Sequence, residues 1–61
     1  MALSIAELRR LNNVSQQEMA EYIGVHVNTY RRLESNPKEF RVSQAVKIAK
    51  RFNVAIGDII F

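Results

Sequence analysis

Hydrophobic residues at helical spacing divide the chain into short amphipathic segments. In the first segment they fall at every third position, at Ile5, Leu8 and Leu11. Ser4 stands three residues before Glu7, the spacing of a capping box, in which each side chain accepts a hydrogen bond from the other residue's backbone N–H. The segment therefore predicts a helix over about residues 5–12 with the three apolar side chains on its inner face.

The same capping pattern returns before the second segment, where Ser15 precedes Glu18 by three residues. The inner stripe that follows consists of Met19, Ala20 and Ile23. Gly24 suits the helix C-terminus, where the backbone often needs a positive φ. We expect a helix of two turns that starts at Gln16.

A third helix is predicted from Val27 to Ser35, with Tyr30 and Leu33 facing the core. Asn36-Pro37 ends it, because proline disfavours helical geometry in the preceding residue and has no N–H to donate. Residues 36–42 then read as a polar loop.

Ser43 is the expected cap of a fourth helix, and Asn53 its stop. The core positions of this helix are Ala45, Ile48, Ala49 and Phe52. A short fifth helical segment is expected over about 56–60, and no alternation typical of strands is present. The predicted fold is all-α, a compact bundle of about five short helices. The chain's last three residues, Ile59, Ile60 and Phe61, are read as core, with a further chain segment or a second copy as alternative partners.

Length and composition narrow the possibilities. The 61 residues suffice for one domain, 1–61, either a whole regulator or part of a longer one. The chain has no cysteine, so packing has to stabilise it, which favours a reducing, cytoplasmic location. No stretch approaches the roughly 20 apolar residues of a membrane helix, and no signal peptide is recognisable. The net charge of +3 and the pI near 9.8 suit a polyanionic partner.

The predicted helix 27–35 carries an unusual outer face. At 100° per residue, Val27, Asn28, Arg31 and Arg32 fall within an arc of about 140°, opposite the core side. Arginine can donate two hydrogen bonds to guanine, asparagine can pair with adenine, and a small apolar group can contact the thymine methyl. A solvated helix face is the alternative interpretation, although such faces more often carry Glu and Lys.

Two short helices joined at Gly24 have the layout of a helix-turn-helix, whose second helix enters the major groove. The stretch SQQEMAEYIGVHVNTYRRLE resembles the phage repressor and Cro-type (XRE) helix-turn-helix family, and the likeness runs from IAELRRLNNVS to KIAKRFNVAIGDIIF. The resemblance implies a lambda-repressor-like fold. It also implies a sequence-specific transcriptional regulator, commonly a repressor, that binds a palindromic operator in double-stranded DNA as a homodimer.

The resemblance also assigns roles to individual residues. The positions that match the family's base contacts are Val27, Asn28 and Arg32, with Arg31 between them and able to touch bases or backbone. The positions that match its phosphate contacts are Gln16, Lys38 and Arg41. By contrast, Lys47, Lys50 and Arg51 are explained by the dipole of their own helix and are left outside the site.

Arg9 and Glu34 match a family pair that ties the first helix to the end of the third. Three residues depart from the family pattern. His26 replaces a stronger N-cap and can shift the start of the third helix by one residue. Tyr30 replaces a branched aliphatic residue and brings a hydroxyl that needs a partner. Ala55 replaces a polar cap.

A helical protein-interaction module, antitoxin-like or regulatory, is the alternative function, because one scaffold supports several functions. In that case the arginines would meet an acidic protein, which has little use for Val27 and Asn28. An enzyme is not expected, since no nucleophile, acid–base pair or phosphate loop is recognisable. With one histidine, His26, and no cysteine, no metal or other cofactor is expected, and no small-molecule ligand is evident.

Overall fold

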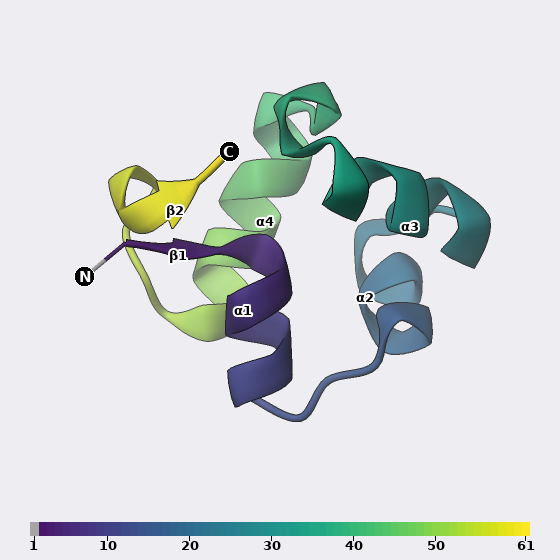
Figure 1. Cartoon of the computed structure of the whole chain (residues 1–61), viewed down its shortest axis with the longest axis horizontal. Coiled ribbons are helices and arrows are strands. Elements are labelled where there is room, and N and C mark those ends of the chain that lie inside the picture. The colour runs from purple at the N-terminus through teal and green to yellow at the C-terminus, as the bar shows by residue number, and fades with distance from the viewer. Residues whose placement is uncertain (1) are drawn as a thin grey trace.

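The computed structural model describes residues 2–61. Across these residues it has four α-helices, which are α1 (Ile5–Leu11), α2 (Gln16–Ile23), α3 (Val27–Ser35) and α4 (Val42–Phe52). Two 3-10 turns, η1 (Pro37–Glu39) and η2 (Ile56–Asp58), and two short strands, β1 (Leu3–Ser4) and β2 (Ile59–Ile60), complete the chain. In Figure 1, α2 and α3 lie together on one side of the molecule and the strand pair lies on the other. The predicted all-α fold class is confirmed.

The first two helices begin where their capping boxes predict. The Ser4 side chain accepts a hydrogen bond from the Glu7 backbone, and the Glu7 carboxylate accepts one from Ser4, at 3.1 and 3.0 Å. The reciprocal bonds of Ser15 and Glu18 measure 3.0 and 3.2 Å. These bonds satisfy backbone N–H groups that a helix start leaves without partners.

Helix α1 ends one residue earlier than predicted and its last apolar side chain is not in the core. Asn12 is the C-cap, and Asn13 takes the left-handed conformation with φ 56°. Leu11 is 69% exposed. A spacing of three residues drifts by about 60° per step around a helix, so the third position has turned away from the face that Ile5 and Leu8 bury.

The start of α4 corrects the prediction that Ser43 is its cap. The helix begins at Val42, and the backbone N–H of Arg41 donates to the Gln44 side chain at 2.9 Å. The N-cap is therefore Arg41, two residues before the expected Ser43, and the Gln44 side chain provides one of the two bonds of a capping box. Ser43 lies inside the first turn of the helix. The predicted loop is also shorter, since Pro37–Glu39 forms η1. The predicted stop holds: Asn53 is left-handed with φ 54°.

The C-terminal segment is not the fifth helix that was predicted. A 3-10 turn, η2, leads into β2, which pairs in parallel with β1 in the register Leu3 with Ile59 and Ser4 with Ile60. The partner strand is at the other end of the sequence, so no local pattern announces this pairing. The two β-branched isoleucines suit an extended conformation.

The core lies between the helices and is closed by Ile59 from β2. Its buried members are Ile5, Leu8, Met19, Ala20, Ile23, Tyr30, Leu33, Phe40, Ile48, Ala49 and Ile59. Ala45 is buried as predicted, whereas Phe52 is only half-buried. Ile60 and Phe61, also expected in the core, are 52% and 37% exposed. Ile60 is exposed because alternate residues of a strand face opposite sides, so only its neighbour reaches the core.

Candidate nucleic-acid interface

Helices α2 and α3 are joined by a tight turn that leaves one face of α3 free. Gly24 adopts φ 77°, and the Val25 N–H returns to the Ala20 carbonyl at 2.9 Å. This is the left-handed helix ending for which glycine is favoured. Buried Met19 and Tyr30 hold the two helices to the common core. The result is a helix-turn-helix with α3 as its second helix.

Helix α3 starts at Val27, as predicted. Although histidine is a weak N-cap, the Nδ1 atom of His26 accepts a hydrogen bond from the Asn28 backbone N–H at 3.1 Å. The imidazole nitrogen thus accepts the capping hydrogen bond that a hydroxyl oxygen usually accepts at this position. The positions of Val27 and Asn28 on the first turn of α3 are not shifted.

The outer face of α3 exposes three of its four predicted base-contact residues. Asn28, Arg31 and Arg32 are exposed, whereas Val27 is half-buried and packs partly against the core. The valine is therefore only partly available as an apolar contact. What the face offers to a partner is mainly an amide and two guanidinium groups.

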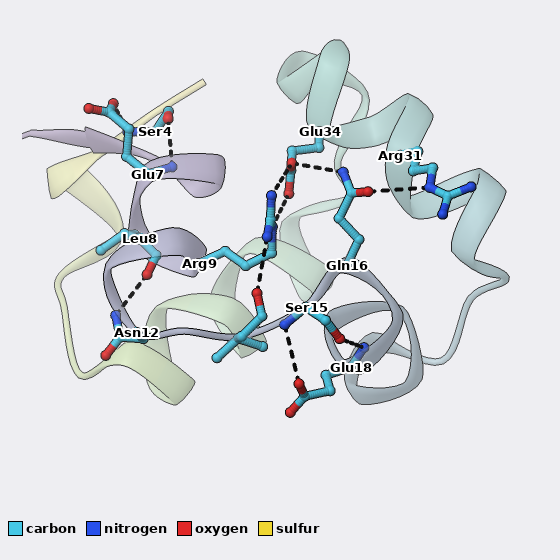
Figure 2. Close-up of polar contacts among 11 residues, drawn as sticks. Ser4, Glu7, Leu8, Arg9, Asn12, Ser15, Gln16, Glu18, Arg31 and Glu34 are labelled. Carbon is cyan, nitrogen blue, oxygen red and sulfur yellow. Dashed lines mark hydrogen bonds and ion pairs between the residues drawn. The ribbon is translucent and has the colours of Figure 1, made fainter.

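A run of hydrogen bonds connects this face to the start of α2. The Arg31 Nε donates to the Gln16 Oε1 at 3.2 Å, and the Arg31 Nη1 donates to the Asn28 Oδ1 at 3.3 Å. Gln16 in turn donates from Nε2 to the Glu34 carboxylate at 3.1 Å. Figure 2 shows Gln16 lying between Glu34 and Arg31. Gln16 and the outer face of α3 therefore form one continuous polar surface.

Arg9 and Glu34 come together as an ion pair between α1 and the end of α3. Two parallel hydrogen bonds join them, from Arg9 Nε at 2.9 Å and from Nη2 at 3.1 Å, and Nη1 donates to the Val14 carbonyl at 3.0 Å. The two side chains are only 12% and 7% exposed. This pair fixes the C-terminal half of α3 against the rest of the domain (Figure 2).

The protonation of this cluster follows from its partners. Burial by itself raises the pKa of Glu34, but hydrogen bonds from Arg9 and Gln16 and the nearby Tyr30 hydroxyl hold it below its usual value. The Glu34 carboxylate raises the pKa of Arg9. Burial, and then Glu34, raise the pKa of Tyr30, whose buried hydroxyl has no hydrogen bond of acceptable geometry among the described residues. Glu34 is thus ionised and Tyr30 neutral at physiological pH.

The predicted phosphate contacts beyond α3 lie in two places. Arg41, exposed before α4, and Arg32 both line an open polar cavity of about 500 Å³ between α3, η1 and the start of α4. Lys38 lines a different, more apolar cavity of about 300 Å³, which Phe61 also lines. Arg41 therefore lines the same cavity as Arg32, whereas Lys38 lines a different one.

Two contacts of charged side chains were not predicted. Glu39, on η1, lies 3.6 Å from the Arg32 guanidinium, with both side chains more than half exposed. Its position seven residues after Arg32 gave no periodic signal, because Pro37 interrupts the helix. On α4, the side chains of Lys47 and Arg51 lie over the ring of Tyr22, at 5.4 and 5.0 Å from its centroid. Both cations therefore contact α2, and Arg51 in addition lies in the last turn of α4, where a positive charge is favoured.

Among residues 2–61, no three acidic or histidine side chains gather in a way that could hold a metal ion. None of the helices in that range is long and apolar enough to cross a membrane.

Comparison with known families provides the assignment that this geometry suggests. A helix-turn-helix family model matches residues 5–59, a range that runs from the start of α1 to β2. Comparison with curated proteins and with solved structures found no match to this chain. With the family model covering most of the chain, and with its α2–turn–α3 geometry in place, the protein belongs to the XRE-type helix-turn-helix family of DNA-binding transcription regulators.

Proposed function

We propose that this protein is a sequence-specific transcriptional repressor that reads DNA with the outer face of α3. The observation that supports it best is the exposed cluster of Asn28, Arg31 and Arg32, with Val27 at its edge, on the second helix of a helix-turn-helix. An amide and two guanidinium groups can hydrogen-bond to base edges in the major groove. Repression would follow if bound protein blocks access to a promoter.

Phosphate contacts would flank this reading face. We assign them to Gln16 at the first residue of α2, to Arg41 before α4, and to Lys38 on η1. Backbone N–H groups in the first turn of a helix have no partner within the helix and favour anions. These contacts would set the register of the protein on DNA, and the two cations among them would contribute to the salt dependence of binding.

We further propose that two copies bind a palindromic operator. The exposed apolar residues around the 300 Å³ cavity include Val42, Ile56 and Phe61, exposed to 77%, 43% and 37%. A contact between these surfaces in two copies would bury apolar area and leave the outer face of each α3 free. A palindromic operator would mirror the two-fold symmetry of such a dimer.

Selection of bound duplexes from a random pool tests this function. A palindromic consensus is the expected result. Recovery of all sequences with equal efficiency would contradict sequence-specific binding and favour a helical protein-interaction module, in which the arginines meet an acidic protein partner.

A further inference from the structure

The amide of Gln16 is used at both ends within the protein. Its Nε2 donates to Glu34 at 3.1 Å, and its Oε1 accepts from Arg31 at 3.2 Å. An ionised carboxylate only accepts hydrogen bonds and a guanidinium only donates them, so the two neighbours dictate which way the amide points. Glu34 is itself held by Arg9 in a nearly buried pair. The orientation of Gln16 is therefore set from the interior of the domain.

The same reasoning extends to Asn28. Its Oδ1 is turned toward Arg31 and accepts from it at 3.3 Å, so its NH₂ group lies on the side of the amide away from Arg31. Arg31 provides only donors. Figure 2 shows the bonds from Glu34 through Gln16 to Arg31, and the Arg31 guanidinium continues this chain to the Asn28 amide. At this part of the α3 face the structure presents hydrogen-bond donors.

This polarity matters for base recognition. Guanine presents two acceptors, O6 and N7, in the major groove, whereas adenine presents one acceptor and one donor. Asparagine recognises adenine by using its oxygen and its nitrogen together, and here the oxygen is turned toward Arg31, so that an adenine would have to share it with the guanidinium. A surface of donors complements guanine better than adenine.

We propose that Gln16 is a positioning residue that holds Arg31 and Asn28 as a joint donor pair, and that this pair reads guanine. The inference rests on the proposed function, since it concerns the face that would enter the major groove. It assigns the Gln16 side chain to orientation of the reading residues, and leaves the backbone N–H of Gln16 as its contact to a phosphate.

The experiment starts from selection of bound duplexes with the wild-type chain and with Arg31→Ala. The base pair whose preference is lost in the variant identifies the step that Arg31 reads. At that step we expect guanine. Replacement of this guanine by 7-deazaguanine, which lacks the N7 acceptor, should weaken wild-type binding by about 10-fold, within the range of a good bidentate contact.

Gln16→Ala then tests the positioning role, with Gln16→Met as a second variant that keeps the side-chain bulk without the hydrogen bonds. Both should reduce the 7-deazaguanine effect to about 2-fold while the salt dependence of binding stays unchanged. Gln17→Ala is the matched control, because Gln17 occupies the same helix start and, among residues 2–61, its side chain bonds only to Glu21 on its own helix. It should behave as wild type.

The possible failures are distinguishable. A clear consensus with adenine at the Arg31 step, or Gln16 variants that weaken binding to specific and scrambled duplexes alike and keep the full 7-deazaguanine effect, would overturn the positioning role and leave sequence-specific binding intact. Equal recovery of all duplexes by the wild-type chain would overturn the proposed function and this inference with it.

Discussion

Arg9 on α1 and Glu34 near the end of α3 are joined by two parallel hydrogen bonds of 2.9 and 3.1 Å, although 25 residues separate them in sequence. The pair is nearly buried, and Gln16 and the Val14 carbonyl complete its hydrogen bonding. Glu34 thus contacts both Arg9, which joins α3 to α1, and Gln16, which bonds to Arg31 on the outer face of α3.

Arg9→Ala should lower the free energy of unfolding by about 3 kcal/mol, because it leaves a nearly buried carboxylate without its cation. Urea denaturation of the wild-type and variant chains measures the difference. Arg10→Ala is the control, since Arg10 is the exposed neighbour on the same helix. A loss below about 1 kcal/mol would mean that the pair behaves as an exposed surface pair.

Glu34 should make stability depend on pH in the acid range. Its folded-state pKa lies below the ordinary value of 4.5, so the stabilisation from ionised Glu34 is present above pH 4.5 and is lost as the pH falls through the folded-state pKa. Glu34→Gln should therefore show a shallower loss of unfolding free energy below pH 4.5 than wild type, measured by urea titration at each pH. Parallel curves for the two proteins would contradict the assignment.

Arg32 and Lys38 should separate reading from electrostatic attraction. Arg32→Ala should cost about 1 to 3 kcal/mol on the preferred site and much less on unrelated DNA. The exposed Glu39 partner does not change this expectation, because exposed ion pairs are weak. Lys38→Ala should weaken binding to all sequences alike and lower the salt slope by about one. Titration of both variants against specific and scrambled duplexes at several salt concentrations distinguishes the roles. An equal loss on both duplexes for Arg32→Ala would make Arg32 a phosphate contact.

If two copies bind one operator, the half-sites should lie one helical turn apart, roughly 34 Å or 10 base pairs. Footprinting should then protect two half-sites, and scrambling one should weaken binding to the other. Val42→Asp, at the most exposed large apolar side chain of residues 2–61, should weaken this coupling by disfavouring an apolar contact between copies. Protection of one isolated half-site, with affinity unchanged when the other is scrambled, would rule the dimer out.

The sequence by itself determined the helices and most of their ends, because those signals act over only a few residues. Ser4 with Glu7 and Ser15 with Glu18 sit three residues apart, and Gly24 needs only its own φ. The two-faced character of residues 27–35 also follows from helical periodicity alone. The start of α4 also depends on a local contact, the bond from the Arg41 N–H to the Gln44 side chain. The prediction that Ser43 caps this helix was wrong, because serine is a common N-cap and Gln44 was not considered.

Only the tertiary structure decided which distant groups meet. The β1–β2 pairing joins segments near the two ends of the sequence. Each strand has only two residues, which is too short for an alternation of apolar and polar residues to be recognised in the sequence. Arg9 and Glu34 were expected together from family resemblance alone, and nothing in the sequence placed Gln16 between Glu34 and Arg31. Periodicity tells which face of a helix a side chain occupies, whereas the packing angle of α2 against α3 decides which donor reaches which acceptor. Arg31 bonds to Gln16 on α2 as well as to Asn28 on its own helix, so the orientation of the Asn28 amide emerged from the structure and not from the sequence.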